Sequence, residues 1–152
     1  MLVRGNYLGH FRNNGGTILI KDGIFKSNEV TSFFDVEYGK IIIDNGNFEG
    51  NGVFINAIGN FSGTEVIIEG GSFKTENAPA FCFSSFCSPL KVTLGNCSIS
   101  SKNSSAISIA DAEYGLNEKL GSLTVDGCYV EGDDGAISLN SRNVLCNKWV
   151  DS

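Results

Sequence analysis

Proline, histidine and basic residues are scarce in this chain, and each scarcity excludes something. Only 2 prolines and 1 histidine occur among 152 residues, and 11 lysines and arginines face 17 aspartates and glutamates. The net charge of −6 argues against nucleic-acid binding, which requires a basic face. The lone His10 and the absence of any Cys-x-x-Cys pair exclude the usual zinc signatures. We therefore expect no metal and no cofactor.

Long hydrophobic runs and helical periodicity are also missing. No stretch approaches the roughly 18 apolar residues of a membrane span, and residues 1–16 contain no apolar run typical of a signal peptide. We expect no membrane insertion and no recognisable signal peptide. Since no segment has a convincing helical period, leucine-rich and helical-repeat solenoids are excluded too. Strands and turns remain, and the 19 glycines suit many turns.

One short pattern occurs five times. Each copy is an apolar, mostly β-branched triplet followed, five residues after its last member, by one large apolar residue. The copies are Ile18-Leu19-Ile20 with Phe25, Ile41-Ile42-Ile43 with Phe48, Val66-Ile67-Ile68 with Phe73, Val92-Thr93-Leu94 with Ile99, and Leu123-Thr124-Val125 with Val130. The large apolar residues follow one another after 23, 25, 26 and 31 residues. A repeat of this period is typical of a solenoid.

Small residues mark a bend inside every copy. Two positions before the large apolar residue stand Gly23, Gly46, Gly71, Cys97 and Cys128. The position before that is Asp, Asn or Gly, which tolerates left-handed backbone angles. A further strand-like run follows in most copies, at 53–55, 81–83, 106–109 and 136–139. Strand, bend, strand, turn, strand predicts one coil of a parallel β-helix.

The predicted fold class is therefore all-β, a single parallel β-helix of about five to six coils. It spans residues 16–152, and residues 1–15 form an N-terminal cap or partial coil within the same domain. Equivalent residues of successive coils should lie above one another at about 4.8 Å. Phe25, Phe48 and Phe73 would then form an internal aromatic column. Cys97 and Cys128 should stack on adjacent coils as small buried thiols, with the redox state of the five cysteines left open.

The middle member of each triplet should point outward. Leu19, Ile42 and Ile67 are large and aliphatic, whereas the next two copies have Thr93 and Thr124. Three aliphatic side chains in register predict an apolar stripe over the first three coils, and such stripes are typical of contact surfaces. Either the stripe is a self-association face, which implies a homo-oligomer or larger assembly, or the N-terminal segment or a loop covers it.

The last coil contains the one motif that points to chemistry. Residues 131–141 read Glu-Gly-Asp-Asp-Gly-Ala-Ile-Ser-Leu-Asn-Ser. This stretch resembles the Gly-Asp-Asp-Cys-Ile-Ala/Ser motif of polygalacturonase-type glycosidases, right-handed parallel β-helices of the pectin-lyase-like superfamily. The resemblance implies a right-handed coil and catalytic carboxylates at Asp133 and Asp134. One acid would protonate the leaving oxygen, and the other carboxylate would activate water.

The chain departs from that family at its other motifs. Where the family has Asn-Thr-Asp one coil earlier, this chain has Asn103-Ser104-Ser105, which lacks the acid. The family's Gly-His-Gly and Arg-x-Lys motifs have no counterpart. Gly and Asp also suit an ordinary turn, and a calcium site at Asp133 and Asp134 would require further oxygen ligands.

Two functional hypotheses follow. The first is a non-enzymatic structural or adhesive β-helix, part of a viral or phage appendage or surface assembly on a virion or extracellular surface, which self-associates or binds glycans. Glycan binding would use outward aromatic side chains, but Tyr38, Tyr114 and Tyr129 do not share one repeat column. The alternative is a polygalacturonase-like glycoside hydrolase acting on polysaccharide, or an inactive fragment of one.

Overall fold

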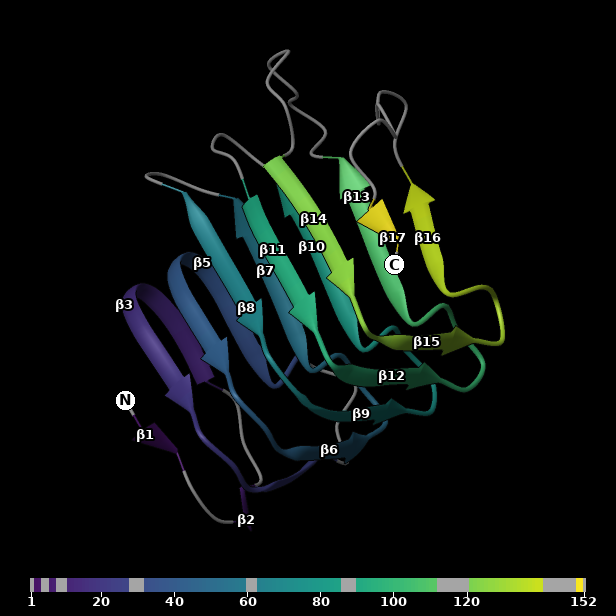
Figure 1. The fold of residues 1–152 in the computed structure, drawn as a ribbon, viewed down its shortest axis with the longest axis horizontal. Coiled ribbons are helices and arrows are strands. Elements are labelled where there is room, and N and C mark those ends of the chain that lie inside the picture. The colour runs from purple at the N-terminus through teal and green to yellow at the C-terminus, as the bar shows by residue number, and fades with distance from the viewer. Residues whose placement is uncertain are drawn as a thin grey trace.

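The molecule is built from short parallel strands joined by turns. A computed structural model describes residues 2–3, 6–7, 11–27, 32–59, 63–85, 90–111, 121–140 and 150–151. All strand pairs within these ranges are parallel, and none of these residues is helical. The chain is an all-β parallel β-helix, which confirms the predicted fold class (Figure 1). Within the described ranges, no helix is long and apolar enough to cross a membrane.

The strands form three faces, and each coil contributes one strand to each face. The first face consists of β1 (Leu2–Val3), the C-terminal halves of β3 (Phe11–Ile20) and β5 (Phe34–Ile43), β8 (Thr64–Ile68), β11 (Leu90–Gly95), β14 (Gly121–Asp126) and β17 (Val150–Asp151). The second face consists of β2 (Asn6–Tyr7), β4 (Ile24–Ser27), β6 (Asn47–Gly50), β9 (Gly71–Thr75), β12 (Cys97–Ser101) and β15 (Tyr129–Gly132). The third face consists of the N-terminal halves of β3 and β5, β7 (Ile55–Gly59), β10 (Phe81–Ser85), β13 (Ile107–Asp111) and β16 (Ile137–Asn140).

The solenoid makes about four turns, counted from β4 to β15. Figure 1 shows β8, β11 and β14 side by side, with β9, β12 and β15 running below them. The expected five to six coils are thus more than the about four turns observed. The two-residue strands β1, β2 and β17 add only short rungs at the ends. Strand β3 runs through the predicted boundary at residues 15 and 16, and β1 and β2 pair with β3 and β4.

The interior contains the predicted aromatic column. The ring centroids of Phe25 and Phe48 are 4.5 Å apart with the rings 7° from parallel, and those of Phe48 and Phe73 are 4.5 Å apart at 9°. Ile99 and Val130 continue the column in register on β12 and β15. The other inward triplet residues are buried on every coil, because only stacked coils can remove them from water.

A second set of phenylalanines, which the repeat does not reveal, packs edge-on against this column. The ring of Phe33 lies 5.9 Å from that of Phe25 at 85°, and the ring of Phe54 lies 5.8 Å from that of Phe48 at 67°. Edge-to-face packing is a favoured arrangement of aromatic rings. The predicted strand at 53–55 is wrong in its position: Phe54 is a fully buried corner residue, and β7 begins at Ile55.

The bend between the first and second faces changes along the molecule. In the first three copies, Gly23, Gly46 and Gly71 adopt positive φ angles of 149°, 151° and 104°. In the last two copies the positive φ lies one residue earlier, at Asn96 (49°) and Gly127 (63°). The same bend is therefore made in two ways, and only the second leaves the following position free to have a side chain.

Candidate functional site

The predicted stripe lies on the outer surface of the first face. Register pairs join Leu19 to Ile42, Ile42 to Ile67, Ile67 to Thr93, and Thr93 to Thr124. The side chains of Leu19, Ile42 and Ile67 are half-buried. The structure thus brings the three sequence-predicted contact residues together on consecutive strands.

The described part of the N-terminal segment does not lie across this stripe. Leu2 pairs with Leu19, so β1 extends the first face as one more rung at its edge. At the other end, Val150 pairs with Thr124. Leu2–Val3 therefore does not cover the stripe. Covering by another part of residues 1–15 or by a loop, the second predicted alternative, stays a prediction.

Charged side chains flank the stripe on both sides and pair along their own columns. On one side, Lys21 Nζ lies 2.6 Å from Asp44 Oδ2. On the other, Lys40 Nζ lies 3.3 Å from Glu65 Oε2, and Lys91 Nζ lies 3.9 Å from Glu65 Oε1. Since these cations and anions neutralise one another between coils, the stripe has a polar rim of mixed sign.

Asp133 and Asp134, the two predicted catalytic residues, occupy the centre of a tight turn between β15 and β16. The Gly135 N–H donates to the Gly132 carbonyl at 3.0 Å, which closes the turn around them. Both aspartates are exposed. Their own N–H groups donate to the coil below, to Ser101 O and Ser104 O at 3.2 Å each. The backbone hydrogen bonds of the turn are therefore enough to explain where both aspartates lie.

The Asp133 carboxylate already has a structural partner. Its Oδ2 accepts the N–H of Asn103 at 3.0 Å, and Asn103 has a left-handed φ of 64°. Asn103 in turn donates from its side-chain amide to Glu76 O and Asn77 Oδ1, at 3.2 Å each. The Asp133–Asp134 turn thus belongs to a series of polar turns on successive coils, which are joined by hydrogen bonds between adjacent coils.

No metal site accompanies this turn in the described part of the chain. Glu131 accepts the Tyr129 hydroxyl at 2.8 Å. No group of three or more His, Cys, Asp or Glu side chains that could hold a metal occurs within the described ranges. Asn103 and Ser104 bond to the turn: the Asn103 N–H donates to Asp133 Oδ2, and the Ser104 carbonyl accepts the Asp134 N–H.

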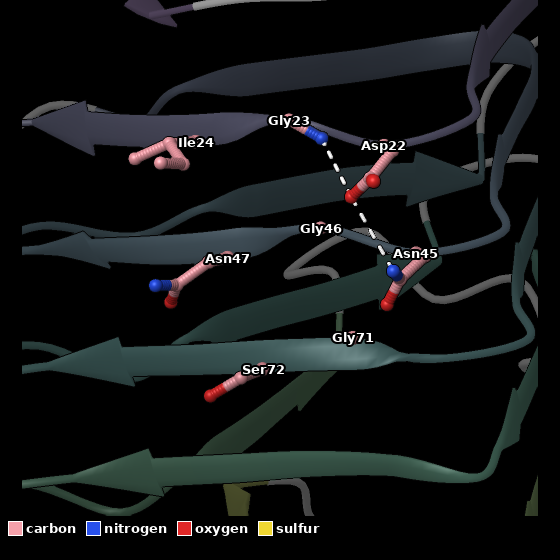
Figure 2. A pocket seen from close by; sticks show the side chains of 8 residues that line it. All are labelled: Asp22, Gly23, Ile24, Asn45, Gly46, Asn47, Gly71 and Ser72. Atoms are coloured by element: carbon pink, nitrogen blue, oxygen red, sulfur yellow. Dashed lines mark hydrogen bonds between the residues drawn. The ribbon is translucent and has the colours of Figure 1, made fainter.

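A shallow hollow, which sequence reasoning missed, lies at the bend between the first and second faces (Figure 2). Its volume is about 580 Å³. Asp22 Oδ1 accepts the Gly23 N–H at 2.9 Å and the Asn45 amide at 3.3 Å, so this carboxylate holds the bend. The residues that line the hollow are Asp22, Gly23, Ile24, Asn45, Gly46, Asn47, Gly71 and Ser72. The hollow follows from the glycine column, which leaves the corner bare of side chains.

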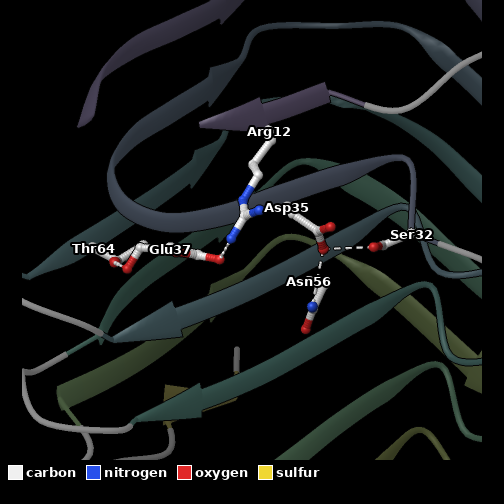
Figure 3. A network of polar contacts seen from close by, with 6 residues as sticks. All are labelled: Arg12, Ser32, Asp35, Glu37, Asn56 and Thr64. Carbon is white, nitrogen blue, oxygen red and sulfur yellow. Dashed lines mark hydrogen bonds and ion pairs between the residues drawn. The ribbon is translucent and has the colours of Figure 1, made fainter. Parts of the chain in front are cut away.

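A polar network on the third face was also missed (Figure 3). Arg12 forms an ion pair with Glu37. Asp35 Oδ1 accepts the Ser32 hydroxyl at 2.5 Å and the Asn56 amide at 3.0 Å. Arg12, Asp35 and Asn56 share one register column. Arg12 and Asp35 each stand 6 residues before a triplet, whereas Asn56 stands 10 before its own, so only the first two share a constant offset in the sequence. Both carboxylates bind neighbouring coils, which makes the network a tie between coils.

The outward tyrosines do not form a row. Tyr129 is 61% exposed on β15, whereas Tyr38 is half-buried on β5. A Cβ at Gly15 would lie 2.7 Å from a Tyr38 ring carbon, so that ring packs over the glycine. Tyr114 lies outside the described residues.

Comparison with known proteins gives no family for this chain. No family model, no curated protein and no solved structure matches it. The fold and the geometry above are therefore the only grounds for a function.

Proposed function

We propose that this protein is a structural or adhesive β-helix that acts by association, and that the Leu19–Ile42–Ile67 stripe binds a second copy of the chain. The observation that supports this most is the register of three half-buried aliphatic side chains on the outer surface of one sheet. Single surface aliphatics are ordinary in soluble proteins, but a contiguous apolar patch is typical of an interaction site.

The flanking columns favour a second copy over a charged partner. Lys21 with Asp44, and Glu65 with Lys40 and Lys91, leave little net charge beside the stripe. A strongly charged partner would gain little there, whereas an identical face meets no strong like-charge repulsion. Association of β-helices side by side suits an elongated assembly. The setting we propose for such an assembly is a viral or phage appendage, or another surface assembly, on a virion or extracellular surface.

Light scattering coupled to size exclusion tests this proposal. We expect the unaltered protein to be larger than a monomer at micromolar concentration. Ile42→Lys should make it monomeric, because a buried lysine at the centre of the stripe is strongly disfavoured. The matched control is Asn47→Lys, which places the same charge on exposed β6 of the same coil and should leave the mass unchanged. A monomer at micromolar concentration contradicts the proposal.

The alternative is a polygalacturonase-like glycoside hydrolase of the pectin-lyase-like superfamily, or an inactive fragment of one. The exposure of Asp133 and Asp134 on one turn supports it, while the Asn103 N–H on the Asp133 carboxylate weighs against it. Release of reducing ends from polygalacturonate is the test. Hydrolysis that falls at least a hundredfold in both Asp133→Asn and Asp134→Asn favours the enzyme, and hydrolysis unchanged by either substitution rejects it.

A further inference from the structure

Two cysteines face each other across the last two coils of the second face. Cys97 precedes Ser98 on β12, and Ser98 pairs in register with Tyr129, the first residue of β15. Cys97 and Cys128, the residue just before β15, therefore occupy equivalent positions on adjacent coils. Their Sγ atoms are 3.2 Å apart. Cys97 is buried and Cys128 is half-buried. The predicted stacking of these two thiols is confirmed.

The backbone conformation explains why this position of the bend has a side chain in the last two copies and is glycine in the first three. In the first three copies the position has a positive φ, and at Gly71 a Cβ would lie 2.9 Å from the Gly46 carbonyl oxygen. In the last two copies Asn96 and Gly127 take the left-handed angle instead. The next residue then has room for a side chain, and in both copies that residue is cysteine.

We propose that Cys97 and Cys128 form a reversible disulfide that fastens the last coil to the coil before it. In-register parallel neighbours have Cα atoms about 4.8 Å apart, inside the 4.4–6.8 Å range of disulfides. The sulfurs need to approach by only about 1 Å to reach bonding distance. Neither requirement calls for a change in strand register.

A low-molecular-weight disulfide of the glutathione type is a sufficient oxidant. The more accessible Cys128 thiolate attacks one sulfur of this oxidant, forms a mixed disulfide and releases one thiolate. Cys97 Sγ then attacks Cys128 Sγ and releases the second thiolate. The two protons leave Cys97 and Cys128 and end on the two released thiolates, so the oxidant gains two electrons and becomes two thiols. A dithiol reductant reverses the reaction.

The third described cysteine provides an internal comparison. Cys82 pairs in register with Asn56 and Ser108, so no thiol lies beside it on either neighbouring strand. Burial raises the pKa of the Cys82 thiol to about 11, and it also raises the pKa of Cys97, so the pKa does not separate the two sites. Because Cys82 has no thiol on a neighbouring strand, it should stay unpaired under conditions that oxidise the Cys97–Cys128 pair.

The consequence of the disulfide concerns the end of the solenoid. Within the described residues, β15 pairs only with β12 on the second face, and its Val130 side chain is only half-buried. An end rung held on one side opens more easily than an inner one. A covalent bond at Cys128, the residue immediately before β15, would suppress that opening.

Intact-mass analysis of the native protein after incubation with oxidised glutathione tests the proposal. We expect a product lighter by two hydrogen atoms, with peptides containing Cys97 and Cys128 joined and Cys82 still alkylated. The melting temperature should rise by roughly 5–10 °C and return on reduction. If Cys97 and Cys128 both remain alkylatable after unfolding of the treated protein, the proposal is wrong.

Variants separate this pair from the other thiols. With Cys82, Cys87 and Cys146 all changed to Ser, the mass loss and the thermal shift should persist. Cys128→Ser should abolish both, while Cys82→Ser alone should abolish neither. A thermal shift that survives in Cys128→Ser would overturn the proposal even if the mass loss is seen in the unaltered protein.

Discussion

The N-terminal and C-terminal coils share one backbone plan but fill it differently. In the first three copies, Phe25, Phe48 and Phe73 stack face to face, and Phe33 and Phe54 pack against them edge-on. In later coils the column narrows to Ile99 and then to Val130, which is only half-buried. At the corner, Phe33 and Phe54 give way to the small residues Ala80 and Ala106.

The outer surface changes at the same point. Leu19, Ile42 and Ile67 give way to Thr93 and Thr124 in the outward column. The bend changes from glycine to cysteine beyond Gly71. The comparison teaches that the ladder of backbone hydrogen bonds fixes the coil, while core stability and surface chemistry are set separately in each coil.

The largest expected effect comes from breaking the aromatic column. Phe48→Ala removes a fully buried ring that is stacked on both sides, and should lower the free energy of unfolding by about 4 kcal/mol. Val130→Ala, at the equivalent position of the last coil, should cost about 1 kcal/mol because that side chain is only half-buried. Guanidinium unfolding of the two variants measures the contrast, and equal losses would contradict it.

The next largest difference in stability is expected between the glycine and the cysteine positions of the bend. Gly71→Ala should destabilise the protein by about 2 kcal/mol, because φ is 104° and the new Cβ would lie 2.9 Å from Gly46 O. Cys97→Ala, at the same position one coil later, keeps a Cβ that the backbone already accepts. It should cost about 1 kcal/mol under reducing conditions. Thermal unfolding in excess reductant compares them, and a harmless Gly71→Ala would show that the bend has no preference for glycine.

A smaller effect is expected from exchanging the two kinds of outward residue. Thr93→Ile would extend the aliphatic stripe by one coil and should strengthen self-association by roughly tenfold, since it adds about 1–1.5 kcal/mol of apolar burial per contact. Ile67→Thr should weaken association by a similar factor. Sedimentation equilibrium provides both constants. If the two substitutions shift the constant in the same direction, the stripe does not govern association.

The smallest effect should come from the flanking ion pairs. Lys21→Gln removes the pair with Asp44, yet the side chain of Lys21 is 49% exposed and water screens the interaction. We expect a change within about 0.5 kcal/mol in the free energy of unfolding, shrinking further at high salt. A loss above about 1.5 kcal/mol would mean that these columns hold the coils together, which the apolar interior is expected to do.

The parts of the fold that lie at a fixed distance from the triplets could be predicted from sequence. Phe48 stacks on Phe25 and Phe73, and Cys97 on Cys128, because the segment between triplet and bend never changes length. Phe54 could not be placed in this way. The turn before the third face varies in length between coils, so its column has no constant offset in the sequence.

The same distinction, between a fixed and a variable distance from the triplets, separates the predictable residues of the candidate site from the others. Leu19, Ile42 and Ile67 belong to the triplets, and their register was predictable. The role of Asp133 was not, because its partner Asn103 lies on another coil across a turn of variable length. The Arg12–Asp35–Asn56 column was missed for the same reason, since it precedes the triplets on the third face.

Equivalent positions of adjacent coils pair with one another along the whole series of strands, and this has an evolutionary consequence. A duplicated stretch from one triplet to the next would find a compatible neighbour above and below, so the rod can lengthen by whole units without redesign. Loss of a single amino acid between Val66 and Phe73 would instead shift every later side chain of that unit out of alignment with both adjacent coils. Such a chain tolerates large insertions of the right size better than the smallest deletion.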